Sequence, residues 1–120
     1  MIAGIGVDII EIERVIRACE KPSFCNRCFT QAEQRLMEQD RKKAASNFAV
    51  KEAVVKAFGT GFGKISPDQI EVLRNEKGMP YVNLYHEAAD IAKELAWEAI
   101  HVSVSHTKEL VTAYVVAEKN

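Results

Sequence analysis

The chain lacks any long apolar run, and its N-terminus lacks the basic segment that precedes the apolar core of a secretory signal. No stretch approaches the roughly 20 consecutive apolar residues that a membrane-spanning helix needs. We therefore expect a cytoplasmic protein with no membrane partner. The formal net charge is only -1, so the composition also argues against a nucleic-acid partner.

Cysteine is scarce, with three residues that all lie between positions 19 and 28. An odd number of cysteines argues against a disulfide framework and is typical of a reducing compartment. Cys25 and Cys28 have the spacing of half a zinc site, but no second cysteine pair follows and the three histidines are scattered. We interpret the cysteines as reduced thiols that hold no metal.

Linkers, internal repeats and low-complexity segments are also lacking. The 120 residues are 48% hydrophobic and 28% charged, which is enough apolar material for one core without disulfide or metal support. We therefore predict a single domain over residues 1–120.

Hydrophobic spacing predicts a mixture of strands and helices. Thr30 and Glu33 form a capping-box pattern at a helix start, and Gly59 has the position of a left-handed C-cap. Residues 75–78 read as the turn of a hairpin. The expected strands span residues 2–10, 70–74, 80–84, 101–105 and 110–117. The first expected helix begins at Glu11 and is closed by Pro22, and the others span 30–39, 43–58 and 84–97. This order predicts an α+β fold, a single compact domain with a mostly antiparallel sheet packed on helices.

The alanine-rich helix expected over residues 43–58 carries polar side chains in an otherwise apolar segment. Glu52 and Lys56 are four residues apart and share a helix face. An ordinary surface ion pair explains this spacing equally well. Lys56, however, stands just before a loop with three glycines, where backbone N–H groups and an ammonium group can approach a phosphate together.

Asp8 lies near the carboxyl end of the first expected strand, after Gly4 and Gly6. Its carboxylate could cap the helix that follows. If the fold brings Asp8 beside Glu52, the two carboxylates make a site suited to Mg²⁺, which water and phosphate oxygens would complete. Without a metal, the two charges would repel each other.

The third polar feature is the segment Ser103-Val104-Ser105-His106-Thr107. Its hydroxyl and imidazole groups suit phosphate or sugar oxygens. A solvated strand end accounts for the same residues, so the segment alone does not indicate a binding site.

In chain order, these features resemble the signature of the 4′-phosphopantetheinyl transferases. The resemblance covers essentially the whole chain, and its most specific part is an aromatic residue, two residues, Lys-Glu-Ala, two residues and Lys. The motifs that carry it are Gly6-Val7-Asp8, Phe48 to Lys56, Gly59-Thr60-Gly61 and Ser103 to Thr107. One departure is Asn47, because the family usually has Arg or Lys immediately before the motif aromatic. A phosphate contact is therefore expected to be missing here.

The resemblance implies transfer of the phosphopantetheine arm of coenzyme A to a serine of an acyl carrier protein. It implies that Asp8 and Glu52 hold Mg²⁺, and that Lys56 faces the phosphates as the third catalytic residue. It also implies a homotrimer with active sites between subunits. The residues expected to bind coenzyme A are Lys56, Gly59, Thr60, Gly61, Ser103, His106 and Thr107.

An acidic carrier protein would need a basic docking surface on this nearly neutral chain. The cationic residues expected to form it are Arg14, Arg17, Lys21 and Arg27. The first three have helical spacing opposite the apolar positions of the first helix. The alternative is a solvated helix face on which Glu13 pairs with Arg17.

Two other functions use the same residues. One is a different Mg²⁺-dependent nucleotide or phosphate transferase, although the chain has no Walker-type lysine motif. The other is a non-catalytic oligomeric domain that binds coenzyme A or an acidic partner through the basic helix. Loss of transfer with retained binding in Glu52→Gln would argue against the non-catalytic domain.

Overall fold

The computed structural model describes residues 1–120 and has the predicted α+β fold. Three strands form an antiparallel sheet in the order β1-β5-β4, and β2 pairs with β3 in a separate hairpin. No helix has both the length and the apolar character needed to cross a membrane. The elements are β1 (Ile2–Glu11), α1 (Ile12–Ala18), α2 (Pro22–Cys28), α3 (Gln31–Gln39), α4 (Lys42–Phe58), the short 3₁₀ helix η1 (Pro67–Gln69), β2 (Ile70–Arg74), β3 (Pro80–Leu84), α5 (His86–Glu94), β4 (Ala99–His106) and β5 (Leu110–Glu118).

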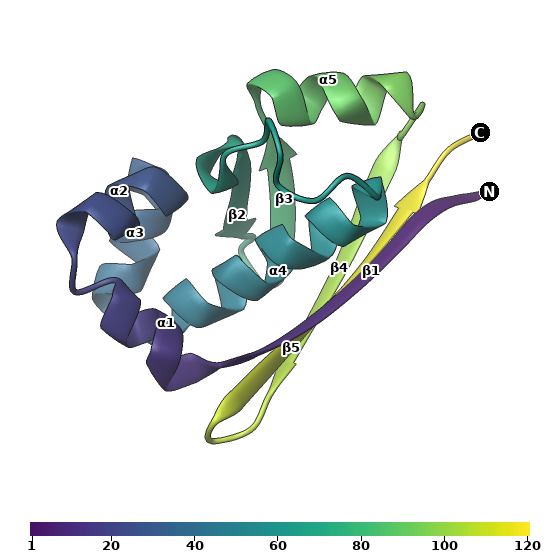
Figure 1. Cartoon of the computed structure of the whole chain (residues 1–120). Helices are drawn as coiled ribbons and strands as arrows, with labels where there is room; N and C mark the ends of the chain where they lie inside the picture. The colour runs from purple at the N-terminus through teal and green to yellow at the C-terminus, as the bar shows by residue number, and fades with distance from the viewer.

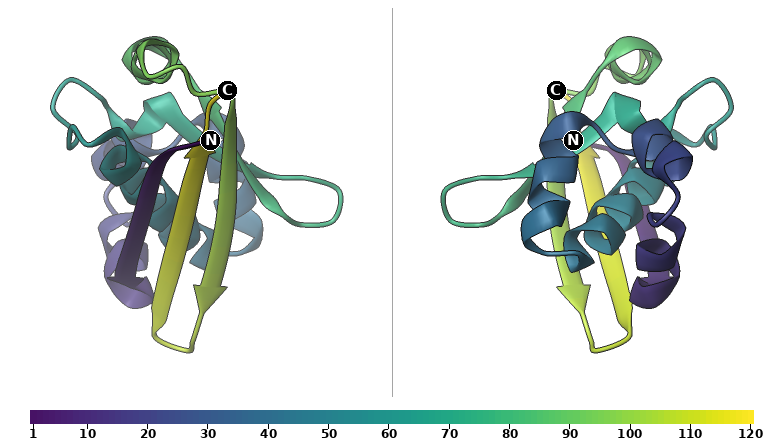
Figure 2. Two further views of the ribbon diagram at one scale, coloured as in Figure 1. Left: turned by 90° about the vertical axis from the view of Figure 1, so that its right-hand side faces the viewer. Right: turned by 90° about the vertical axis from the view of Figure 1, so that its left-hand side faces the viewer.

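Helix α4 covers the inner face of the three-stranded sheet and forms the centre of the core (Figure 1). Strand β5 turns every second side chain toward α4, and these side chains are buried because strand side chains alternate between the two faces. They are Val111, Ala113, Val115 and Ala117. The outer face of the sheet has no helix over it, as the left view of Figure 2 shows.

Two glycines of β1 let this strand lie directly against the backbone of α4. A Cβ atom on Gly6 would lie 1.8 Å from the carbonyl oxygen of Ala53, and one on Gly4 would lie 2.7 Å from that of Ala57. No other residue fits at Gly6 without moving the strand from the helix. The spacing of β1 and α4, and so the position of Asp8, depends on this close packing.

A buried polar network joins α4 to α3 and to β2. The Lys51 ammonium group is fully buried and donates to Glu33 Oε1 at 2.8 Å and to the Pro67 carbonyl at 2.8 Å. Glu33 Oε2 accepts from Asn47 Nδ2 at 3.0 Å and from the Val72 backbone N–H at 3.2 Å. Because each charged group has several partners, the network can remain buried and hold the three elements in one arrangement.

Several sequence predictions hold in detail. Thr30 Oγ1 accepts from the Glu33 N–H at 3.2 Å, and Glu33 Oε1 accepts from the Thr30 N–H at 3.0 Å, which confirms the capping box. Gly59 ends α4 with φ of 81°, as a left-handed C-cap should.

The predicted first helix ends earlier than expected, and the sequence analysis did not predict the second helix that begins at Pro22. Helix α1 ends at Ala18, and Pro22 occupies the first turn of a second helix, α2. Proline is well suited to a helix start, and it disfavours helical backbone at the residue before it. Lys21 accordingly has an extended conformation.

The predicted helix over residues 84–97 is shorter in the structure. Leu84 is paired with Ile70 in the hairpin, so α5 begins only at His86. Ala96 has φ of 59°, which a right-handed helix does not allow, and α5 ends before it at Glu94.

Candidate functional site

Asp8 lies on the β1 edge of the sheet and its side chain points toward α4. Its Oδ1 atom accepts a hydrogen bond from Lys56 Nζ at 2.9 Å, and the same ammonium group donates to the Val7 carbonyl at 3.0 Å. The Asp8 side chain is only 12% exposed, whereas that of Lys56 is 55% exposed. The second carboxylate oxygen, Oδ2, is buried and has no hydrogen-bond partner. An unpaired buried oxygen of this kind is costly unless a ligand satisfies it.

Glu52 stands one helical turn before Lys56 on the same face of α4. Partial burial raises the pKa of its carboxyl group, the nearby charge of Asp8 raises this pKa further, and Lys56 lowers it in part. The Glu52 carboxylate has no hydrogen bond and no ion pair of its own. Asp8 and Glu52 are thus close enough to repel each other electrostatically, as the sequence analysis expects for a site without its metal.

These two carboxylates are suited to a hard divalent cation. No cluster of three or more His, Cys, Asp or Glu side chains that could hold a metal is present in the structure. Mg²⁺ commonly takes only one or two carboxylates from a protein and completes its shell with water and substrate phosphates. The unpaired Asp8 Oδ2 and the repulsion at Glu52 are both relieved by such an ion, so the residues fit it.

The glycine loop, residues 59–63, follows the C-terminus of α4 on the same edge of the sheet as Asp8. Gly59, Gly61 and Gly63 have φ values of 81°, 67° and 33°, a backbone conformation that other residues rarely adopt. The loop is largely exposed, and the Thr60 hydroxyl donates to the Gly61 carbonyl. Its backbone is therefore free to approach a ligand beside β1.

The predicted segment from Ser103 to Thr107 does not act as one unit. Ser103 pairs with Tyr114 on the outer face of the sheet, whereas His106 pairs with Val111 on the inner face. The Thr107 hydroxyl accepts from the backbone N–H groups of Glu109 and Leu110 and so supports the turn between β4 and β5. His106 lines a polar cavity next to β4.

That cavity, which we call the basic cavity, has a volume of about 310 Å³ and lies between the start of α4, the β2-β3 hairpin and the end of β4. Its charged residues are Lys42, Lys43, Arg74 and Asp40, together with His106. Asp40 is paired with Lys43 at 3.2 Å. Excess positive charge in a concave, polar site is suited to a phosphate group.

Sequence analysis missed Lys42, Lys43 and Arg74. The lysines look like any solvated helix start, and Arg74 comes from a hairpin about thirty residues later in the chain. Only the packing of the hairpin against α4 brings these cations together.

The Asp8 site and the basic cavity occupy opposite edges of the three-stranded sheet. The left view of Figure 2 shows the loop after α4 projecting beside β1 and the β2-β3 hairpin projecting beside β4. Lys42 and Gly59 stand at opposite ends of α4, roughly 25 Å apart at 1.5 Å per residue. Because α4 fills the inner face between the two edges, one chain does not bring the two halves of the predicted site together.

The outer face of the sheet is apolar on the side of β1 and polar along β4, where Ser103 and Ser105 lie. Ile5, Val7, Ile9 and Tyr114 project from β1 and β5 with exposed fractions between 44% and 63%. A continuous apolar face on paired strands is typical of a subunit interface.

The predicted basic docking residues are exposed, and none of them forms an ion pair within the chain. The alternative pairing of Glu13 with Arg17 is absent. Lys21 lies in the turn before α2 and Arg27 lies on α2 itself, so the four cations are spread over two helices and their connection. Arg14 also borders an apolar groove that contains Phe24 and Phe48.

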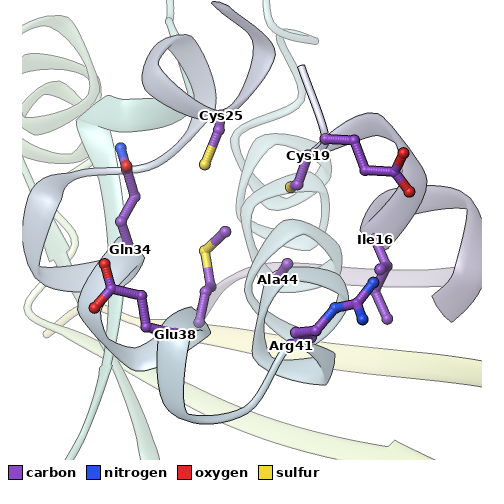
Figure 3. A pocket seen from close by; sticks show the side chains of 9 residues that line it. Ile16, Cys19, Cys25, Gln34, Glu38, Arg41 and Ala44 are labelled. Carbon is purple, nitrogen blue, oxygen red and sulfur yellow. The ribbon is translucent and has the colours of Figure 1, made fainter. Parts of the chain in front are cut away.

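The cysteines line or fill a different part of the molecule. Cys19 and Cys25 lie at a cavity between α1, α2, α3 and the start of α4, as Figure 3 shows, and Cys28 is buried in the core. The volume of this cavity is about 450 Å³. Cys25 and Cys28 therefore point to different environments, although their spacing resembles half a zinc site. Burial raises the pKa of the Cys19 thiol to about 12, so this thiol is protonated at neutral pH.

An α+β domain with two neighbouring carboxylates, a lysine beside them and a separate basic cavity has the chemistry expected of proteins that bind phosphate-rich ligands. Residues 4–116 match the family model of the 4′-phosphopantetheinyl transferase superfamily. The chain belongs to this family.

Its relatives agree in sequence and in structure. The chain is 60% identical over 118 residues to a holo-[acyl-carrier-protein] synthase of Lachnoclostridium phytofermentans. The aligned region covers 98% of this chain and 97% of the relative. A crystal structure of a Bacillus anthracis holo-(acyl-carrier-protein) synthase in complex with CoA (3′,5′-ADP) has a TM-score of 0.81 and 36% identity and covers 100% and 99% of the two chains. A Helicobacter pylori synthase in complex with coenzyme A has a TM-score of 0.82 and 29% identity over 95% and 99%.

The raised pKa of Glu52 predicts that Glu52→Gln stabilises the metal-free protein at neutral pH. Folding raises this pKa above its ordinary value of 4.5, so the ionised group opposes folding at higher pH and has no such effect well below pH 4.5. The gain should reach no more than about 1 kcal/mol because solvent screens the site. Chemical denaturation with a chelator present, at several pH values, measures it.

The matched control is Glu94→Gln at an exposed position of α5. It should change the free energy of unfolding by less than about 0.5 kcal/mol at each pH. A Glu52→Gln variant that is no more stable than the wild type at neutral pH would show that neither burial nor the charge of Asp8 disfavours the ionised Glu52 carboxylate.

Proposed function

We propose that this chain transfers the 4′-phosphopantetheine moiety of coenzyme A to a serine of an apo acyl carrier protein, with Mg²⁺ as cofactor. The products are holo acyl carrier protein and adenosine 3′,5′-bisphosphate. Family membership and the relatives over nearly the full chain support the reaction. The observation that carries the site assignment is the contact of Asp8 with Lys56 next to Glu52, with one Asp8 oxygen left unpaired.

Asp8 and Glu52 would hold the Mg²⁺. When bound, the ion supplies positive charge that neutralises the pyrophosphate of coenzyme A and makes it a better electrophile. The chain itself supplies two carboxylates on rigid elements, one on β1 and one on α4. Their positions are fixed before the ligand arrives, so little reorganisation is needed.

Lys56, which contacts Asp8, would act on the same phosphates. The serine hydroxyl of the carrier protein attacks the β-phosphate, a phosphodiester forms, and the bond to adenosine 3′,5′-bisphosphate breaks. Lys56 stabilises the charge on the leaving phosphate and is placed to protonate it. Either Glu52, through a water molecule, or Asp8 accepts the proton of the serine.

The 3′-phosphoadenosine end of coenzyme A binds in the basic cavity of a neighbouring chain. Support comes from His106 in that cavity and from its cations, and from the position of the cavity on the sheet edge opposite Asp8. The apolar outer face formed by Ile5, Val7, Ile9 and Tyr114 supplies the contact between chains, and a homotrimer would bring the two edges of neighbouring sheets together. Gly59, Thr60, Gly61, Ser103 and Thr107 would then complete the coenzyme site from one chain or the other.

The acidic carrier protein docks on the exposed cations of α1 and α2, namely Arg14, Arg17, Lys21 and Arg27. Their lack of internal ion pairs leaves them available for a partner. The function belongs to fatty acid biosynthesis, because the modified partner carries acyl groups. Three free thiols fit the reducing cytoplasm.

A transfer assay tests the proposal. The protein is mixed with apo acyl carrier protein, coenzyme A and MgCl₂, and mass spectrometry measures the addition of one phosphopantetheine to the carrier serine. Glu52→Gln and Asp8→Asn should each lower the rate by about 100-fold or more, because each removes charge needed in the transition state. A chelator should have the same effect on the wild type, and Glu94→Gln should retain the wild-type rate.

Mixing two inactive variants tests the shared active site. Asp8→Asn removes one half of the site and His106→Ala weakens the other, so each alone should be slow. Refolded together in equal amounts, they should regain activity, because about a quarter of the sites then combine two wild-type halves. Sedimentation velocity should show a trimer throughout. A mixture no faster than its components would place the complete site within one chain.

A further inference from the structure

Arg74 is a partly buried cation that forms no direct ion pair within the chain. It lies at the end of β2, at the mouth of the hairpin, and lines the basic cavity with Lys42 and Lys43. No carboxylate lies within 4.0 Å of its guanidinium group. Partial burial lowers the pKa of Arg74, while Glu33 and Asp40 act at longer range to raise it. A guanidinium group in such a place is stabilised by an anionic ligand.

Asn47 holds this guanidinium group in position. Both donor hydrogens of the fully buried Asn47 amide are used, because Nδ2 donates to Glu33 Oε2 at 3.0 Å and to the Val72 carbonyl at 2.9 Å. The amide orientation is therefore fixed, and Oδ1 is left as an acceptor. Arg74 Nη1 donates to this oxygen at 2.9 Å. The guanidinium group has further N–H donors that remain free for a ligand.

The contact between Asn47 and Arg74 explains why this chain can have Asn47 where the family usually has Arg or Lys. The residue before the motif aromatic points into the protein, toward Glu33 and β2, and so Asn47 itself is not available to a ligand. Its side chain instead presents Arg74 to the basic cavity. Position 47 and position 74 thus act together, and a cation reaches the cavity from the hairpin.

We propose that Arg74, positioned by Asn47, binds the 3′-phosphate of coenzyme A and makes the enzyme selective for coenzyme A over its 3′-dephospho form. This inference rests on the proposed function, because that function supplies the ligand. The other groups facing the phosphate are Lys42 and His106, while Lys43 is paired with Asp40 and contributes less. A fork of N–H donors matches a phosphate dianion better than a single ammonium group does.

Equilibrium titrations with coenzyme A, 3′-dephospho-coenzyme A and adenosine 3′,5′-bisphosphate test the proposal. Arg74→Gln should raise the Kd for the two ligands with a 3′-phosphate by about tenfold or more, since a charge-assisted hydrogen bond is lost. The Kd for 3′-dephospho-coenzyme A should change by less than about twofold. Arg74→Lys keeps the charge and should fall between Arg74→Gln and the wild type.

Lys77→Met is the matched control, because Lys77 is an exposed cation of the same hairpin outside the basic cavity. It should leave all three Kd values at their wild-type level. Equal weakening of coenzyme A and its dephospho form by Arg74→Gln would overturn the inference, as would a wild type without preference between them. The transfer assay on the wild type separates the two proposals. Absence of transfer with both coenzyme A and its 3′-dephospho form contradicts the proposed function. Unchanged selectivity in Arg74→Gln contradicts only the role of Arg74.

Discussion

The contact between the backbones of β1 and α4 at Gly6 determines where the candidate catalytic groups lie. With no side chain at Gly6, the strand reaches the carbonyl of Ala53, and Asp8 two residues later comes within 2.9 Å of Lys56. Glu52 lies next to Ala53 on the same helix, so one close approach sets both carboxylates and the lysine. The cost is an unpaired carboxylate oxygen and mutual repulsion, and a bound divalent cation would relieve both.

The two lysines of the motif segment have opposite roles. Lys51 is fully buried and joins α4 to Glu33 and to the backbone before β2, so it stabilises the arrangement of helices and hairpin. Lys56 is more than half exposed and meets Asp8 at the edge of the sheet. The Lys51 network also includes Asn47, and through it the position of Arg74 in the basic cavity depends on the same buried carboxylate. Core and site therefore share one set of hydrogen bonds.

Local patterns were enough to predict most elements, the capping box at Thr30 and the C-cap at Gly59, because short-range chemistry determines these features. Helix α2 was missed, because Pro22 was interpreted as the end of one helix, whereas it occupies the first turn of the next. The proximity of Asp8 to Lys56 followed from motif resemblance, as nothing in either segment alone specifies a contact across 48 positions.

The basic cavity could not be predicted, because Arg74 joins the lysines of α4 only through hairpin packing. Alternation along a strand already places Ser103 and His106 on opposite faces of the sheet, but the prediction grouped them in one site.

The proposed catalytic site depends most directly on a divalent cation that binds between Asp8 and Glu52. Crystals grown with MnCl₂ and coenzyme A would locate the ion by its anomalous scattering. We expect a single strong peak at about 2.1 Å from oxygens of both Asp8 and Glu52, with coenzyme phosphate oxygens completing the shell. A metal bound by only one of these carboxylates, or located away from both, would contradict the account.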